Sequence, residues 1–372
     1  MNRGIGSIPR RIVVGAFTHA FGQRAFSEAR SLVRMASRED MRLDIPWSHR
    51  ISAWRSGFTA ANAAIYGLHD VDRTQYLPDY AFYYRCGYIN PIPQLFDQKL
   101  VLRRVLRDHG FAQAETIALV TAHGVILDPL ENNARHISKA EFERILVSRG
   151  GGVISKPQNG RYGQGIDLLD VVDGQLIARN RCDSRPYSIV HDTPPNTLFE
   201  GAIPQHEFWQ SLSPSSFNTL RILTLWIPGE PEPFIARAVQ RMGTVDTLPT
   251  DNWDRGGLIA AVDPETGTMQ TGRINRFKTS RPDVAYPVHP DTGAPIEGMT
   301  LPFWDEIART TLSAARSLPY APYIGWDVGV DISGTPVIVE GNKNPGLRTL
   351  QFNGGLLANP RIRRFYASFG VI

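Results

Sequence analysis

The chain contains little cysteine and no long apolar run. Its two cysteines, Cys86 and Cys182, lie far apart, with no Cys-x-x-Cys or Cys/His spacing around them. This pattern excludes a disulfide framework and a zinc site, and it favours free thiols in a reducing compartment. No 18 consecutive apolar residues occur, so no membrane-spanning helix is expected. The apolar residues 12–17 lack a clean signal-peptide cleavage site, so we expect a cytoplasmic protein.

Lysine is also scarce, and neither sign of charge dominates. The 40 Lys and Arg residues exceed the 36 Asp and Glu residues by a net charge of +4. That excess is too mild for a nucleic-acid surface, so no nucleic-acid partner is expected. Lysine occurs only at Lys99, Lys139, Lys156, Lys278 and Lys343. A lysine is therefore a less casual residue here than in most proteins. The chain of 372 residues is long enough for two or three domains.

The apolar pattern predicts an α+β chain with antiparallel sheet, and a doubly wound parallel sheet fits worse. Residues 20–70 have mainly helical spacing, and residues 71–96 form a packed, irregular connection. Further helices are predicted at 98–109, at 139–147 after the cap Ser138, and at 306–318. Strands are predicted at 116–120, 125–127, 153–156, 166–172, 220–226, 234–239, 327–331 and 336–340.

Asp327, Glu340 and Asn342 form the most informative polar set. They lie on two predicted strands joined by the turn Ser333-Gly334. Residues i and i+2 of a strand face the same side, so Glu340 and Asn342 point together, and the neighbouring strand can bring Asp327 beside them. Two carboxylates and an amide oxygen form a hard oxygen site suited to Mg²⁺. The alternative is the polar end of a solvated hairpin.

Lys156 precedes a glycine-rich loop at residues 159–165. Glycines at Gly160, Gly163 and Gly165 let backbone N–H groups turn towards an anion, and Lys156 adds a point charge at the end of a strand. The loop is not a Walker A motif, because the sequence contains no Gly-Lys dipeptide, and it is not GxGxxG. The alternative is a plain hairpin turn.

A short extended segment surrounds Glu200. The backbone of Glu200, Gly201 and Ile203 could bind the edge of an adenine ring. Glu207, seven residues after Glu200, could hold ribose hydroxyls, with His206 as a rival for that role. The alternative is an edge strand followed by a loop.

The order of these features resembles the ATP-grasp superfamily. Lys99 precedes a helix, Lys156 precedes the glycine loop, Glu200 follows, and the Asp327…Glu340-x-Asn342 set comes late. The resemblance runs from about residue 97 to residue 346. Members of this superfamily hold ATP between two α+β subdomains, with two lysines on the phosphates, a glycine-rich flap over them and a late Mg²⁺ set.

Three longer motifs narrow the resemblance. Residues 216–222, 251–257 and 325–346 resemble the sugar-transfer-associated ATP-grasp branch, which is related to alpha-L-glutamate ligases. The resemblance implies an ATP-grasp fold preceded by a largely helical N-terminal region. The implied divisions are residues 1–95, residues 96–198 with the flap, and residues 199–372 with the metal site.

The resemblance also implies a role for each candidate residue. Lys99 and Lys156 would contact phosphates beneath the flap glycines 160, 163 and 165. The segment from Glu200 to Ile203 would bind adenine and Glu207 the ribose. One or two Mg²⁺ ions would be held by Asp327, Glu340 and Asn342.

The remaining candidates belong to the transfer step and the second substrate. Arg221 and Arg241 would contact the γ-phosphoryl group and the acyl phosphate, and a structural salt bridge is the alternative for each. Asn252, beside Gly256-Gly257, would shape the acceptor site. Lys343 and Arg348 are candidates for binding substrate, Arg348 through its bidentate guanidinium.

The expected function is therefore an ADP-forming carboxylate–amine ligase that uses ATP and Mg²⁺ and passes through an acyl phosphate. Its partners would be a small-molecule acid and amine, in surface polysaccharide or specialised-metabolite biosynthesis. The alternatives are a kinase of the same fold that phosphorylates a hydroxyl group, and a module that senses ATP without turnover. Oligomeric state is left open.

Overall fold

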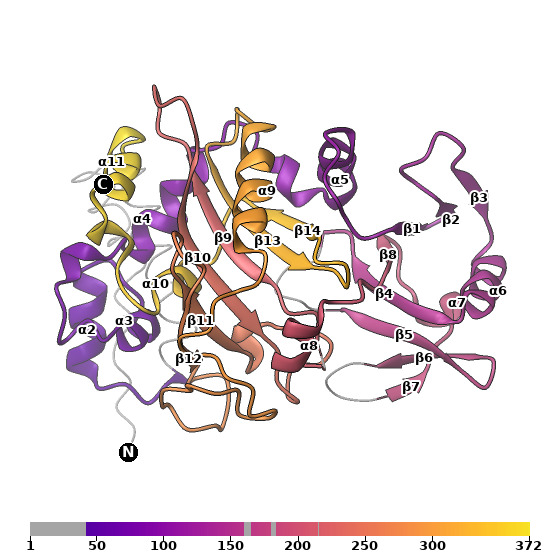
Figure 1. The fold of residues 1–372 in the computed structure, drawn as a ribbon, viewed down its shortest axis with the longest axis horizontal. Coiled ribbons are helices and arrows are strands. Elements are labelled where there is room, and N and C mark those ends of the chain that lie inside the picture. The colour runs from indigo at the N-terminus through magenta and orange to yellow at the C-terminus, as the bar shows by residue number, and fades with distance from the viewer. Residues whose placement is uncertain (1–41, 160–164, 180–183, 215) are drawn as a thin grey trace, which may run out of the picture.

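The computed structural model describes residues 42–159, 165–179, 184–214 and 216–372, which form two antiparallel sheets with helices on their faces (Figure 1). The α-helices are α2 (Trp47–Arg55), α3 (Ala60–Tyr66), α4 (Asp79–Tyr84), α5 (Lys99–Asp108), α6 (Lys139–Arg149), α7 (Ile189–Asp192), α8 (Glu207–Leu212), α9 (Trp304–Arg316), α10 (Leu347–Gln351) and α11 (Pro360–Ser368). Short 3₁₀ helices are η2 (Arg73–Gln75), η3 (Cys86–Tyr88), η4 (Pro93–Asp97), η5 (Trp253–Arg255) and η6 (Leu356–Ala358). The strands are β1 (Thr116–Thr121), β2 (Gly124–Leu127), β3 (Arg135–Ile137), β4 (Gly151–Pro157), β5 (Asp167–Val172), β6 (Gln175–Arg179), β7 (Ser184–Pro186), β8 (Thr197–Gly201), β9 (Leu220–Leu225), β10 (Phe234–Met242), β11 (Leu258–Val262), β12 (Met269–Ile274), β13 (Tyr323–Val330) and β14 (Pro336–Asn342).

The first sheet contains eight strands in the order β3-β2-β1-β8-β4-β5-β6-β7. Helix α6 packs on one face, where its buried Phe142 and Leu146 share a core with Phe199 of β8. The helix begins where the Ser138 side chain accepts a hydrogen bond from a backbone N–H, and it ends at Gly150, whose φ is 87°. Strands β4 and β8 are paired, so the segments that carry Lys156 and Glu200 lie side by side.

The second sheet contains six strands in the order β12-β11-β10-β9-β13-β14. Its central strand β9 alternates strictly: Leu220 and Ile222 face the core under α9, and Leu223 and Leu225 face the opposite side. Arg221 therefore lies on the same side as Leu223 and Leu225. One face of β9 therefore carries the charged Arg221 near its start and the apolar Leu223 and Leu225 further along.

Helices from both ends of the described chain cover that opposite face. Phe82 of α4, Leu347 of α10 and Phe365 of α11 pack with Leu223 and Tyr323 of the sheet in a second core. Figure 1 shows α2, α3 and α4 beside α10 and α11, on the far side of the second sheet from β1–β7. The N-terminal helices are therefore partners of the second sheet.

The chain passes from the first sheet to the second in the segment that follows β8. Gln205 forms an isolated bridge with Asp331, and the backbone N–H of His206 donates to the Val330 carbonyl over 3.1 Å. The segment that leaves the first sheet is thus tied to the turn between β13 and β14 before α8 begins.

The predicted elements agree closely with the observed ones. The expected strands correspond to β1, β2, β4, β5, β9, β10, β13 and β14, and every strand pairing among the described residues is antiparallel. The α+β prediction is therefore confirmed. Residues 71–96 are more ordered than expected, because they include α4 and three 3₁₀ helices.

Two further expectations bear on the setting of the protein. Cys86 is a buried, free thiol, and Cys182 lies outside the described residues. None of the helices in the described part of the chain combines the length and the apolar character needed to cross a membrane.

Candidate functional site

A row of charged residues crosses three neighbouring strands of the second sheet. Asp327 of β13 lies directly opposite Arg221 on β9 and directly opposite Glu340 on β14. Asn342 lies two residues beyond Glu340, on the same strand and face. The predicted grouping of Asp327, Glu340 and Asn342 is thus present in the strand register, while metal binding by the three residues stays a prediction.

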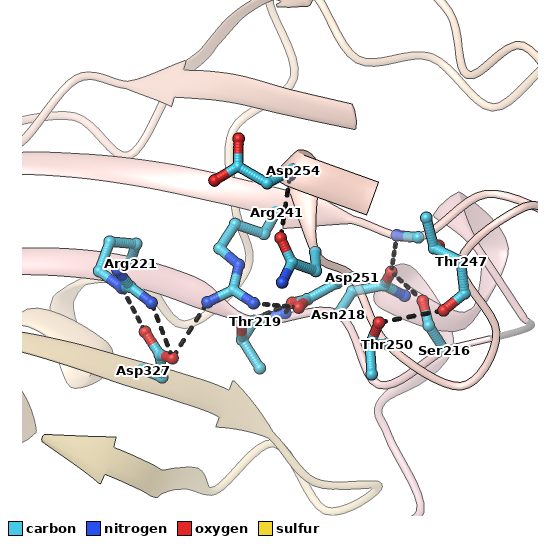
Figure 2. A network of polar contacts seen from close by, with 12 residues as sticks. Ser216, Asn218, Thr219, Arg221, Arg241, Thr247, Thr250, Asp251, Asp254 and Asp327 are labelled. Atoms are coloured by element: carbon cyan, nitrogen blue, oxygen red, sulfur yellow. Dashed lines mark hydrogen bonds and ion pairs between the residues drawn. The ribbon is translucent and has the colours of Figure 1, made fainter. Parts of the chain in front are cut away.

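Two guanidinium groups hold the Asp327 carboxylate (Figure 2). Arg221 binds it with two hydrogen bonds, from Nε to Oδ1 and from Nη2 to Oδ2, the latter over 3.0 Å. Arg241 donates from Nη1 to the same Oδ2 over 3.0 Å. Burial on its own would raise the pKa of the Asp327 carboxyl group, but the charges of Arg221 and Arg241 outweigh it and hold that pKa below its usual range. Asp327 is therefore an anion at neutral pH.

Arg241 has a second acidic partner on its other side. Its Nη2 donates to Oδ1 of Asp251, and Oδ2 of Asp251 accepts hydrogen bonds from the backbone N–H and the hydroxyl group of Thr219, over 2.8 and 2.6 Å. The Asp251 side chain is 5% exposed. Figure 2 shows the resulting line from Arg221 through Asp327 and Arg241 to Asp251.

Lys99 connects the two halves of the molecule. Its Nζ lies 3.5 Å from a carboxylate oxygen of Glu340 in the second sheet, and it donates over 3.4 Å to the carbonyl of Gln158, just after β4 of the first sheet. The neighbouring Lys343 forms an ion pair with Asp97, immediately before α5. These contacts bring the start of α5, the end of β4 and the end of β14 together.

Lys156 lies in a buried ionic cluster next to this junction. Its Nζ is 2.8 Å from Oε2 of Glu200, and Nη2 of Arg103 approaches the same oxygen to 2.9 Å. Burial lowers the pKa of the Lys156 ammonium group, and the charge of Glu200 opposes that shift. Oε1 of Glu200 is buried without a hydrogen-bond partner among the described residues. Two cations on one carboxylate leave a local excess of positive charge.

The remaining candidates for nucleotide binding lie around these groups. Gly165 has a φ of 67°, a backbone conformation that favours glycine, while Gly160 and Gly163 fall outside the described residues. The N–H of Gly201 donates to the carbonyl of Glu115 over 2.9 Å, which removes that donor from ligand binding. Ile203 is half-buried in the crossing segment.

The two rivals for the ribose differ in their setting. Glu207 is exposed in the first turn of α8. His206 caps that helix, because its Nδ1 accepts from the backbone N–H of Phe208 over 3.2 Å, and its ring packs against Trp209 and Phe303. Glu207 therefore has the more accessible side chain.

The loop that begins at Asp251 contains Asn252, whose Oδ1 caps η5 by accepting from the backbone N–H of Asp254 over 2.9 Å. Gly257 closes the loop with a hydrogen bond to the Asn252 carbonyl over 3.1 Å, and a Cβ atom there would lie 2.9 Å from the Asp251 carbonyl oxygen. The position therefore requires glycine.

Arg348 is engaged by protein groups. Its Nε donates to Oδ1 of Asn62 over 2.5 Å, and its Nη1 lies 3.2 Å from Asp254. Asn62 in turn donates to the fully buried Asp79 over 2.6 Å. Arg348 thus links the N-terminal helices to the Asn252 loop, and this arrangement favours a structural role over direct capture of a substrate.

Sequence reasoning missed Arg103 and Asp251. Arg103 follows Lys99 by four residues and so shares its helix face, on a helix whose neighbours Leu102 and Leu106 are buried. The apolar neighbours of Arg103 could have indicated that it is buried, and a buried arginine needs an acidic partner. Asp251 is the first residue of one of the quoted motifs, but nothing local to it predicts Arg241 as its partner.

The donor set fits a hard cation in part. Among the described residues Oδ1 of Asp327 accepts only the Arg221 Nε bond and keeps free lone pairs, whereas the unpartnered, buried Nδ2 of Asn342 is a donor and not a metal ligand. No group of three or more His, Cys, Asp and Glu side chains within the described ranges could hold a metal ion. The residues therefore suit Mg²⁺ when water and phosphate oxygens complete its shell.

Comparison with known proteins gives the family. A search of the curated proteins finds no match. Among solved structures the chain is similar to L-amino acid ligase from Bacillus licheniformis, with 11% identity, a TM-score of 0.35, and coverage of 67% of this chain and 41% of that one. It is also similar to the ATP-grasp ligase PsnB complexed with minimal precursor, Mg and ADP, with 12% identity, a TM-score of 0.37, and coverage of 75% and 61%.

A third similar structure is D-alanine--D-alanine ligase from Bacillus anthracis, with 11% identity, a TM-score of 0.33, and coverage of 67% of this chain and 57% of that one. In all three comparisons the chain spans less than two thirds of the other chain's length. The family model for sugar-transfer associated ATP-grasp proteins matches residues 81–366. This chain belongs to the sugar-transfer associated ATP-grasp family, and its two α+β halves form an ATP-grasp fold.

Proposed function

We propose that this protein is an ATP-dependent carboxylate–amine ligase that forms an amide through an acyl phosphate and releases ADP and phosphate. The proposed site lies between the two sheets, and its substrates are a small-molecule acid and amine in surface polysaccharide or specialised-metabolite biosynthesis. We also propose the division into residues 1–95, 96–198 and 199–372, with the connection after β8 as the hinge.

The observation that carries the proposal is the pair of contacts made by Lys99. Its ammonium group lies 3.5 Å from Glu340 of the second sheet and 3.4 Å from the Gln158 carbonyl, two residues beyond Lys156 in the first. We place the phosphate chain at this junction, where Lys99, Lys156 and the Arg221–Arg241 pair would converge on it. Such a convergence of cations is what a triphosphate requires.

The reaction would proceed in two steps. An oxygen of the acid's carboxylate attacks the γ-phosphorus of ATP, and the bond from that phosphorus to the bridging oxygen of ADP breaks. The amine nitrogen then attacks the acyl carbon, phosphate leaves with the bonding electrons, and the amine gives up a proton to solvent or phosphate. The chain's residues act by position and charge: Lys99, Lys156, Arg221 and Arg241 offset the negative charge on the transferring group.

The metal-binding residues would be Asp327, Glu340 and Asn342. Mg²⁺ bound there would neutralise phosphate oxygens. Arg221 and Arg241 already surround Asp327, so they lie beside the phosphoryl group that such a metal would hold. This placement favours attack at the γ-phosphorus over attack at the α-phosphorus.

The test follows nucleotide and phosphate while the protein is incubated with ATP, Mg²⁺ and a panel of acids and amines. We expect ADP and free phosphate, one for one with the new amide. AMP with pyrophosphate would overturn the mechanism, and ADP with phosphate retained on a hydroxyl group would identify a kinase. Tight ATP binding with no turnover by any pair would identify a sensor. Glu340→Gln should abolish turnover, and Glu306→Gln on the exposed side of α9 is the matched control.

A further inference from the structure

We propose that Asp251 is a positioning residue for phosphoryl transfer: it fixes one arm of the Arg241 guanidinium group so that the other arm can move from Asp327 to the γ-phosphoryl group of ATP. The proposal deepens the proposed function, because it rests on Arg241 contacting that phosphoryl group. Figure 2 shows Arg241 between the two carboxylates.

The Asp251 side of Arg241 is built to stay in place. Oδ2 of Asp251 accepts two hydrogen bonds from Thr219, over 2.8 Å from the backbone N–H and 2.6 Å from the hydroxyl group, and Oδ1 accepts from Nη2 of Arg241. The backbone N–H of Arg241 donates to the Thr219 carbonyl over 2.8 Å. Rotation of the Asp251 carboxylate would break all three of its bonds in a site that is 5% exposed, where unpaired polar groups are costly.

The Asp327 side of Arg241 is built to exchange. Nη1 of Arg241 makes one hydrogen bond, over 3.0 Å, to Oδ2 of Asp327, and that oxygen also accepts from Nη2 of Arg221 over 3.0 Å. Arg221 has a second bond to Oδ1 and another to the Pro345 carbonyl. Arg241 therefore has less to lose than Arg221 when a phosphate oxygen competes for its Nη1.

The charge on Asp327 points the same way. Arg221 and Arg241 are balanced by Asp327 and Asp251, so an incoming phosphate oxygen takes the place of Asp327 on Nη1 of Arg241 and releases one lone pair of Asp327 for the metal. Asp251 and Asn252 are adjacent in sequence, so the loop proposed to shape the acceptor site is also the loop that anchors Arg241. The acceptor site and the arginine that contacts the phosphoryl group thus depend on one short segment.

The test measures the dissociation constants of Mg·ATP and Mg·ADP for the full chain by calorimetry, since only ATP carries the γ-phosphoryl group. Asp251→Asn keeps the volume and removes the charge. We expect it to weaken Mg·ATP about tenfold, the worth of one charge-assisted hydrogen bond, and to change Mg·ADP less than about twofold. Asp251→Glu should restore part of the ATP preference. Asp246→Asn, which removes a neighbouring Asp–Arg pair with Arg281 at 3.2 Å, is the control.

A double-mutant cycle with Arg241→Ala separates positioning from general loss of structure. If Asp251 acts through Arg241, Asp251→Asn has no further effect on Mg·ATP affinity once Arg241 is alanine. Equal weakening of Mg·ATP and Mg·ADP, or additive effects in the cycle, would overturn the proposal. An unchanged ratio of the Mg·ATP and Mg·ADP dissociation constants in Arg241→Ala would also overturn the proposal about Asp251. That result would not contradict the ligase function, which the product assay tests separately. If instead the assay yields AMP, the proposed function fails whatever the binding ratio.

Discussion

Arg221 and Asp327 face each other across paired strands and are joined by two hydrogen bonds, although 106 residues separate them in sequence. Arg241 binds the same carboxylate from β10. Asp327 is therefore the shared counterion of two arginines that are 14% and 15% exposed. The two carboxylates predicted to bind metal therefore differ in their surroundings. Glu340 is 29% exposed and has Lys99 at 3.5 Å, whereas Asp327 is held by two arginines.

We predict that Asp327→Asn and Glu340→Gln differ in stability although both abolish turnover. Asp327→Asn leaves two nearly buried guanidinium groups without their shared anion, so the free energy of unfolding should fall by about 3 kcal/mol. Glu340→Gln should change it by less than about 0.5 kcal/mol. Urea unfolding of both variants at neutral pH measures the difference, and equal losses would show that Asp327 is not the counterion of the arginine pair.

Lys156→Ala should weaken Mg·ATP binding by about 1.5–3 kcal/mol, the worth of a charge-assisted contact. The fold should persist, because Glu200 retains Arg103 at 2.9 Å. Lys139→Ala is the matched control, since Lys139 Nζ of α6 donates to the carbonyl of Thr193, the residue after α7. Calorimetry with the two variants provides the measurement, and an unchanged ATP affinity in Lys156→Ala would remove this lysine from the site.

Mg²⁺ should bind poorly until nucleotide is present. The carboxylates of the site are matched by an equal number of cations: Asp251, Asp327 and Glu340 against Lys99, Arg221 and Arg241. No excess negative charge remains to attract a divalent ion, and phosphate oxygens supply it. Titration of the nucleotide-free protein with Mg²⁺ up to about 1 mM should give no saturable heat, in contrast to the protein with ADP. Tight Mg²⁺ binding without nucleotide would contradict the charge balance.

Asp79 should make stability fall as pH rises. Burial raises the pKa of this carboxyl group from 3.8 to about 6, and hydrogen bonds from Thr59 and Asn62 only partly oppose the shift. Between those two values the folded protein binds more protons than the unfolded chain, so the free energy of unfolding decreases with pH. Relative to Asp79→Asn, the wild type should lose about 3 kcal/mol between about pH 4 and about pH 7. Urea unfolding at several pH values tests this, and a pH-independent difference would refute it.

The sequence by itself determined the local elements and the chemistry they carry. The strand-like runs at 327–331 and 336–340 and the turn at Ser333-Gly334 are local patterns, and they predicted the strands that align Asp327 with Glu340. Helix α9 was recognised from its apolar spacing, although it begins at Trp304 and not at residue 306. These features were predictable because strand and helix periods depend on neighbours within a few residues.

Tertiary structure alone decided which charges pair. The partners Asn62 and Arg348 lie 286 residues apart, and Arg241 lies between Asp251 and Asp327 only because β9, β10 and β13 are neighbours in one sheet. Strands β11 and β12 and helices α10 and α11 were also missed, because their short apolar runs find partners only in the folded sheet, which the two strands extend and the two helices cover. A charged side chain needs an opposite charge when it is buried, but the sequence does not name the partner, because many carboxylates satisfy the same requirement until the fold brings one of them within hydrogen-bond distance.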